Sequence, residues 1–250
     1  MELTELKDKI ISSFTGTKEE LQDVLDLVEV DNAVFPFNEY EFLICNLIEK
    51  KGLSYCDYLA IRQEYIDQNP NLWIFEIAAP RGFGEKFAQT HLKGICKDLQ
   101  KPSKKLDSGY NGEYDFWLDG IKIEVKASRA VDKQSTEPLY CKALSKNSKR
   151  PFLMNFQQLK PNCCDVFIWL AVFRDEIVIW VMSSDDVQNN SYFTPQHRNK
   201  TTAERDKVYN KEDIFEGQIM MTEKNICEFD IHKFSGENLK VAIKNAAKRK

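Results

Sequence analysis

Asp115, Glu124 and Lys126 are the residues in this chain best placed by type and spacing to do chemistry. The dipeptide Asp119-Gly120 lies between them, flanked by runs in which apolar and polar residues alternate. This dipeptide favours a two-residue β-hairpin, because the tightest hairpin turn needs a positive φ at both central positions. Counting outward from the turn places Asp115 opposite Glu124. The sequence therefore predicts two carboxylates side by side on the hairpin.

The two faces of this expected hairpin differ in polarity, because side chains alternate between the faces along each strand. The apolar face comprises Tyr114, Phe116, Leu118, Ile121, Ile123 and Val125. The opposite face comprises Glu113, Asp115, Trp117, Lys122, Glu124 and Lys126. We expect the apolar face to be buried and the charged face to carry the function.

Opposed acids destabilise a hairpin unless something joins them. Cross-strand neighbours have Cβ atoms about 5 Å apart, and two unit charges at that distance repel by roughly 3 kcal/mol at an effective dielectric constant near 20. A divalent cation reverses this repulsion, and Mg²⁺ is commonly held by one or two carboxylates, with waters and phosphate oxygens completing its shell. Lys126 follows Glu124 on the same face at about 6.6 Å. The pattern predicts a Mg²⁺ site with an ammonium group beside it.

Asp115 followed by Glu124-Val125-Lys126 resembles the motif of the PD-(D/E)xK nuclease superfamily, and within it the type II restriction endonucleases. Residues 5–7 and 49–51 match the second half of the motif equally well, but both lie in helical patterns. Tyr114 stands where the family often has proline. The resemblance covers residues 80–182, the expected catalytic core.

The resemblance implies an α/β fold of the restriction-endonuclease type, with a central mixed β-sheet flanked by helices. It implies Mg²⁺-dependent hydrolysis of double-stranded DNA at specific sequences, by a homodimer. Asp115, Glu124 and the Val125 carbonyl would bind Mg²⁺, and Lys126 would orient the attacking water. Glu85 would complete the acidic cluster, although an acid in the first turn of a helix is also favourable without any catalytic role.

Other elements follow from periodicity and end signals. Residues 1–75 read as an amino-terminal helical layer with helices at 17–28, 38–50 and 55–68, the first capped by Thr17 and Glu20. A further helix is expected at 85–99, and strands at 114–118, 121–126, 165–173 and 177–182. Residues 152–160 are expected to form a connecting helix that makes strands 121–126 and 165–173 parallel. We expect residues 1–250 to form a single domain.

The net charge is -4, but residues 86–160 carry an excess of seven positive charges, which favours a surface facing phosphates. Residues 189–215 form a long polar stretch suited to reading DNA, although a solvated loop explains it equally well. The expected DNA contacts are Arg129, Lys133, Gln157, Lys160, His197, Arg198 and Lys200, with Lys142, Lys146, Lys149 and Arg150 as further phosphate contacts.

Composition excludes several classes of protein. The longest apolar run, residues 166–173, is too short to cross a membrane, and the acidic start lacks the features of a signal peptide. We therefore expect a cytoplasmic protein. Three scattered histidines and seven cysteines without a CxxC pair disfavour a zinc site. Two alternatives stay open: a DNA repair nicking nuclease or Holliday junction resolvase of the same fold, and a DNA-binding protein that does not cleave.

Overall fold

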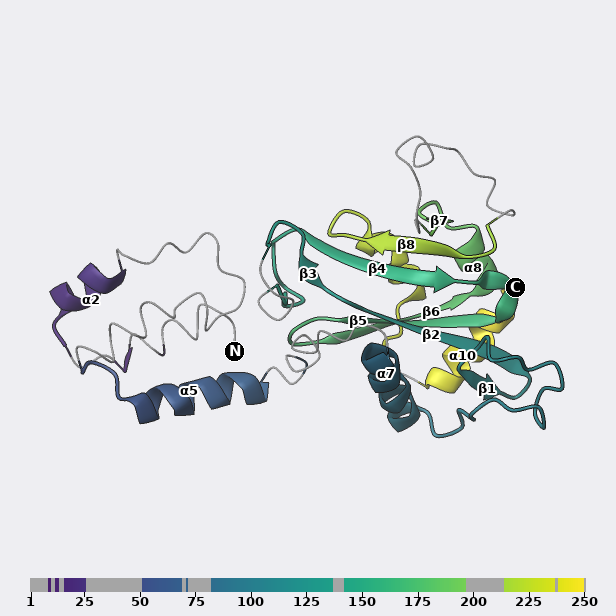
Figure 1. The fold of residues 1–250 in the computed structure, drawn as a ribbon, viewed down its shortest axis with the longest axis horizontal. Helices are drawn as coiled ribbons and strands as arrows, with labels where there is room; N and C mark the ends of the chain where they lie inside the picture. The colour runs from purple at the N-terminus through teal and green to yellow at the C-terminus, as the bar shows by residue number, and fades with distance from the viewer. Residues whose placement is uncertain are drawn as a thin grey trace. The chain divides into compact units, whose positions relative to one another are not determined.

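The computed structural model describes residues 9, 12–13, 16–25, 51–68, 71, 82–136, 142–196, 214–236 and 238–249. Over these residues the protein is a mixed α/β structure with two four-stranded sheets and a few helices (Figure 1). The chain divides into two compact units. The first comprises Met1–Ala78, Val131–Arg150 and Phe173–Glu176, and the second comprises Ala79–Ala130, Pro151–Val172 and Ile177–Lys250.

The first unit contains helices α2 (Lys18–Leu25) and α5 (Tyr55–Gln68) and the short strand β3 (Val131–Asp132). Helix α2 begins with the capping box expected from the sequence. The Thr17 hydroxyl accepts a hydrogen bond from the Glu20 N–H at 3.2 Å, and the Glu20 carboxylate accepts one from the Thr17 N–H at 2.9 Å. Helix α5 occupies the range predicted for it. The helix expected at residues 38–50 lies outside the described residues.

The first sheet lies in the second unit and has the strand order β1-β2-β5-β6. Strand β1 (Phe116–Leu118) is antiparallel to β2 (Ile121–Arg129), and β2 is parallel to β5 (Val166–Val172). Strand β6 (Ile177–Ser183) is antiparallel to β5. The predicted hairpin register and the predicted parallel pair are therefore confirmed. Strand β5 is buried along its whole length, as its uninterrupted apolar sequence indicated.

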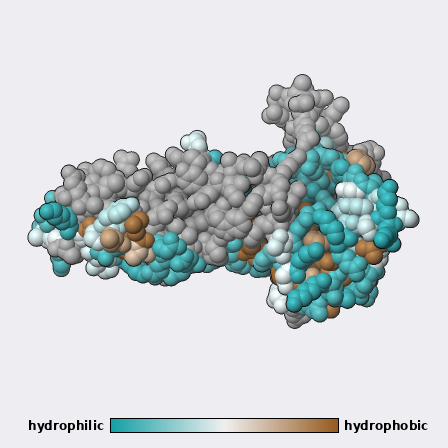
Figure 2. Space-filling view, turned by 60° about the horizontal axis from the view of Figure 1, so that its bottom comes forward, coloured by the Kyte–Doolittle hydropathy of each residue, from teal (hydrophilic) through white to brown (hydrophobic). Residues whose placement is uncertain are grey.

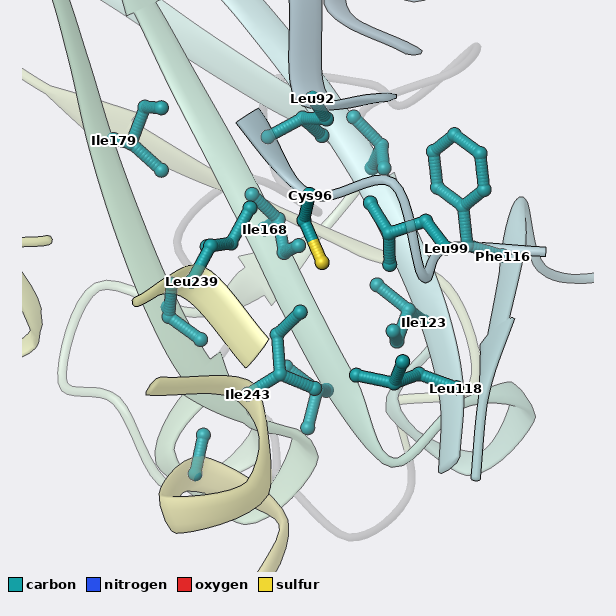
Figure 3. Packing of buried hydrophobic residues seen from close by; sticks show 14 of the residues in the cluster. Leu92, Cys96, Leu99, Phe116, Leu118, Ile123, Ile168, Ile179, Leu239 and Ile243 are labelled. Atoms are coloured by element: carbon teal, nitrogen blue, oxygen red, sulfur yellow. The ribbon is translucent and has the colours of Figure 1, made fainter. Parts of the chain in front are cut away.

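Helices α7 (Gly82–Ile95) and α10 (Leu239–Ala247) cover one face of the first sheet (Figure 3). Helix α7 packs through residues four apart, Ala88 and Leu92, and Cys96 joins the same cluster directly after the helix ends. The sheet contributes side chains that alternate along its strands to the same cluster, including Ile123 and Val125 from β2. This contact fixes the position of α7 beside the hairpin. Four residues of the predicted apolar face are confirmed as core, Ile121 is only partly buried, and Tyr114 is buried outside this cluster against Trp117 of the predicted polar face.

The second sheet contains β3, β4 (Phe152–Leu159), β8 (Gly217–Met221) and β7 (Thr194–Pro195). Strand β8 pairs antiparallel with both β4 and β7. The helix expected at residues 152–160 is therefore wrong, because these residues form β4. Buried Phe152, Met154 and Phe156 alternate with less buried residues, and this period of two belongs to a half-buried strand. The apolar set resumes at Leu159 after Gln158, whose φ of 56° accompanies a bulge in the pairing.

The second sheet packs on the face of the first sheet that α7 and α10 leave open. Phe156 of β4 stacks on Trp169 of β5, with ring centroids 4.6 Å apart. The ring of Phe229, from the 3₁₀ segment Ile226–His232, lies near the same tryptophan, with ring centroids 6.1 Å apart. The short elements Pro161–Cys163 and α8 (Ser184–Gln188) complete the described fold. Among the helices that the structure describes, none has the length and apolar character needed to span a bilayer.

Candidate active site

The turn between β1 and β2 brings the two predicted acids together. Asp119 and Gly120 have φ values of 50° and 92°, which is the conformation that a two-residue hairpin turn of this type requires. Strand β1 ends its regular pairing at Phe116, opposite Ile123. One residue further, the Asp115 N–H still donates to the Ile123 carbonyl at 2.9 Å. Asp115 is thus held beside β2 at the level of Glu124.

Two donors fix the orientation of the Asp115 carboxylate. Gln89 Nε2 of α7 donates to Oδ1 at 2.7 Å, and the Val125 N–H donates to Oδ2 at 2.8 Å. The second bond satisfies a backbone donor of β2 beyond the end of β1. Each oxygen retains a second lone pair, because a carboxylate accepts about four hydrogen bonds in total. Asp115 is therefore oriented and still able to bind a cation.

Glu124 and Lys126 lie next to one another on β2, as the alternation of the strand predicted. Lys126 Nζ is 2.6 Å from Glu124 Oε1, and the two side chains are 12% and 16% exposed. Burial raises the pKa of Glu124 to about 7, although the Lys126 charge opposes this effect. The Asp115 charge and the hydrogen bond between the two acids contribute to this same upward shift in the pKa of Glu124. The predicted repulsion between neighbouring acids is thus visible in the electrostatics of the site.

A second group of charged residues borders this pair. Lys160 Nζ is 2.9 Å from Glu113 and 4.0 Å from Glu216. Hydrogen bonding to Lys160 lowers the pKa of Glu113, and Cys163 also contributes a hydrogen bond to Glu113. Glu113 therefore pairs with Lys160, which leaves Lys126 with Glu124.

The described acids form a pair, not a larger cluster. Glu85 belongs to α7, as predicted, but its side chain lies outside the described part of the structure. Among the described residues, no group of three or more histidine, cysteine or acidic side chains is arranged to hold a metal ion. Asp115, Glu124 and the backbone carbonyl of Val125 are the oxygen donors that the hairpin offers. This small set suits Mg²⁺, which keeps several waters when it is bound by protein.

The expected DNA contacts are dispersed. Gln157 lies exposed on β4 and Lys160 follows that strand, so neither belongs to the helix on which we expected them. Arg129 ends β2, and burial lowers the pKa of its guanidinium group. Lys133 is exposed in the first unit. His197, Arg198 and Lys200 lie outside the described residues.

Gln89 is the site residue that sequence reasoning missed. It precedes Asp115 by 26 residues, and no local pattern links the two. The available signal was the position of Gln89 directly after Ala88, which belongs to the buried stripe of α7. This position places Gln89 at the edge of that stripe, on the side of the helix next to the hairpin. An amide at such an edge is a natural donor for a carboxylate on the neighbouring strand.

Comparison of the sequence with family models and with curated proteins identifies no relative. No family model matches the chain, and no curated protein matches its sequence. Two adjacent carboxylates, one oriented by two donors and the other paired with a partly buried ammonium group, can bind a divalent cation next to a positive charge.

Proposed function

We propose that this protein is a Mg²⁺-dependent endonuclease that hydrolyses phosphodiester bonds in double-stranded DNA. The observation that carries the proposal is the neighbouring position of Asp115 and Glu124 on the β1–β2 hairpin, with Lys126 Nζ 2.6 Å from Glu124. The raised pKa of Glu124 adds support, because burial, with a contribution from the Asp115 charge, makes ionisation of Glu124 in this site unfavourable. A divalent cation removes that cost.

The residues divide the work as follows. Asp115 and Glu124 supply the side-chain ligands for Mg²⁺, and Val125 supplies a carbonyl oxygen beside them. Bound Mg²⁺ lowers the pKa of water and neutralises charge on a phosphate. Lys126 donates hydrogen bonds to the attacking water and to the phosphate oxygen on which charge develops. Gln89 keeps the Asp115 carboxylate turned toward the pair.

The fold supports this proposal in its central part. Helix α7, the β1–β2 hairpin and the parallel pair β2–β5 follow one another in the order expected for a nuclease of the restriction-endonuclease type. Strand β4 and the short segment Pro161–Cys163 replace the expected connecting helix. The proposal therefore rests on the hairpin and its partners, and the connection is a departure from the expected core.

We further propose that the enzyme is a cytoplasmic type II restriction endonuclease that acts as a homodimer at specific sequences. Two symmetric active sites are the simplest way to cut both strands of a palindromic site. Incubation of the purified protein with long unmethylated DNA and Mg²⁺ tests this. Discrete fragments are expected, whereas a smear indicates a nonspecific nuclease. Cleavage of a four-way junction or a single strand only indicates a resolvase or a nicking enzyme.

Variants of the site test the assignment of residues. Asp115→Asn is expected to abolish Mg²⁺-dependent cleavage while DNA binding is retained, because a ligand is lost and the local negative charge falls.

Lys126→Ala is expected to lower the cleavage rate by about a hundredfold or more, with a smaller change in binding. Asp230→Asn and Lys224→Ala alter exposed residues elsewhere and serve as controls. Full activity of Asp115→Asn contradicts the proposal.

A further inference from the structure

Five lysines form an exposed group at the end of α7 and in the loop that follows it. They are Lys93, Lys97, Lys101, Lys104 and Lys105, and we call them the α7-loop lysines. Within the described part of the protein, none of these ammonium groups takes part in an ion pair. Several acidic residues lie near these lysines in the sequence and reduce the net charge of the segment.

The interspersed acids are paired with other lysines. Asp98 binds Lys240 at 2.9 Å, and Asp107 lies 2.9 Å from Lys122. Asp119 lies 2.7 Å from Lys244. The pairing partners come from β2 and α10, so they neutralise the acids and leave the charge of the α7-loop lysines in place. Figure 2, in which the lower side of Figure 1 comes forward, shows hydrophilic residues over much of the second unit on this side.

Helix α7 connects these lysines to the acid pair. Gln89 and Lys93 are four residues apart in α7, so they lie on one side of the helix, about 6 Å apart along its axis, and Lys97 follows two residues after the helix ends. Gln89 itself contacts Asp115 at 2.7 Å. The row therefore starts at the acid pair and continues into the loop that carries the other lysines. The adjoining side of α7, which carries Ala88 and Leu92, is buried in the core.

We propose that the α7-loop lysines bind the phosphate backbone of double-stranded DNA beside the acid pair. This inference rests on the proposed function, and it names the surface along which the substrate lies. Lysine ammonium groups act as point charges toward phosphates, and binding releases counterions from the DNA. The location differs from the one expected from the sequence, since Lys133 and Arg150 belong to the first unit and Arg150 lies 3.5 Å from Asp132.

Two triple variants of equal charge test the surface. The first is Lys97→Gln with Lys101→Gln and Lys104→Gln, and the control is Lys18→Gln with Lys224→Gln and Lys248→Gln. All six side chains are exposed, so folding is preserved and each variant loses three positive charges. Binding of a fluorescent DNA duplex is measured by anisotropy at several KCl concentrations, with EDTA present so that no cleavage occurs.

The first variant is expected to bind at least tenfold more weakly at low salt. Its plot of log K against log[KCl] should be shallower by about 0.9 for each lost phosphate contact, which gives a change between about 2 and 3. The control should keep the slope of the wild type. Equal weakening of both variants, an unchanged first variant, or a wild type that binds no duplex overturns the inference.

The outcome separates this inference from the proposed function. A wild type that cleaves DNA, combined with a first variant that binds like the control, leaves the endonuclease in place and removes the surface. A wild type that binds through the α7-loop lysines but cuts no DNA with Mg²⁺ supports the surface and removes the endonuclease.

Discussion

Gln89 of α7 helps to orient the Asp115 carboxylate, although it lies outside the hairpin. The Gln89→Ala variant loses the donor to Oδ1, so the carboxylate is free to turn about its remaining bond to the Val125 N–H. A hydrogen bond to a charged group contributes about 1.5 to 3 kcal/mol, and we expect Mg²⁺ affinity to fall by roughly tenfold or more. Calorimetric titration of the purified protein with Mg²⁺ measures this.

Gln100→Ala is the control for this prediction, because Gln100 is an exposed residue of the loop after α7. Its backbone bridge to Trp117 survives the substitution. The thermal midpoint of both variants in EDTA shows whether a change in affinity reflects folding. Equal Mg²⁺ affinity in the Gln89 variant and the control would remove Gln89 from the site.

Glu124 predicts how the stability of the metal-free protein depends on pH. The pKa of Glu124 is raised from 4.5 to about 7 in the folded chain, chiefly by burial. The folded state therefore binds the proton more tightly than the unfolded state, so this carboxyl favours folding below pH 4.5. Stability is expected to fall as the pH rises from about 4.5 to about 7, by roughly 3 kcal/mol in total.

Urea unfolding in EDTA at a series of pH values measures this loss. Glu124→Gln carries no titrating group, so its stability should vary less over the same range. Addition of Mg²⁺ at neutral pH should restore stability to the wild type and not to the variant. If the free energy of unfolding depends on pH in the same way for both proteins, the raised pKa of Glu124 is contradicted.

At the scale of elements, the β1–β2 turn determines whether Asp115 lies opposite Glu124. Gly120→Ala places a side chain at a φ of 92°, a conformation that costs an L-residue roughly 1 to 2 kcal/mol. We expect stability to fall by that amount and cleavage to fall with it, because the turn holds the register. Denaturant unfolding and a plasmid cleavage assay measure the two effects.

Gly94 provides a matched glycine in a different conformation. It lies in α7, and a Cβ built there meets no atom within 4 Å. Gly94→Ala is therefore expected to stabilise the protein by about 0.5 to 1 kcal/mol. If Gly120→Ala and Gly94→Ala change the free energy of unfolding in the same direction, the positive φ at Gly120 is not what makes the turn sensitive to substitution.

The elements also show what the sequence could predict. The hairpin, its register and the parallel partner strand follow from local signals, namely the Asp119-Gly120 turn, the alternation around it and one uninterrupted apolar run. Strand β4 was not predicted from local signals, because the bulge at Gln158 interrupts its alternation of apolar and polar residues. The resemblance to restriction endonucleases also favoured a helix there. The contact of Gln89 with Asp115 depends on how α7 packs, and packing between distant segments leaves no local pattern.

At the scale of the second unit, β4 changes the environment of the acid pair. The first sheet lies between α7 and α10 on one face and the second sheet on the other, so β2 is covered on both faces. A strand covered in this way has little water around its side chains, which explains the burial of Glu124 and Lys126. An exposed hairpin would leave Glu124 solvated and its pKa at the ordinary value.

The packing of the two sheets is itself testable through the ring of Phe156. Phe156 is 1% exposed and stacks on Trp169 across the interface, so Phe156→Ala leaves a cavity between the sheets and should cost about 3 to 5 kcal/mol. Met220→Ala, on the outer side of β8 and 44% exposed, should cost less than about 1 kcal/mol. Guanidinium unfolding measures both, and equal losses would mean that the Phe156 ring is not packed between the two sheets.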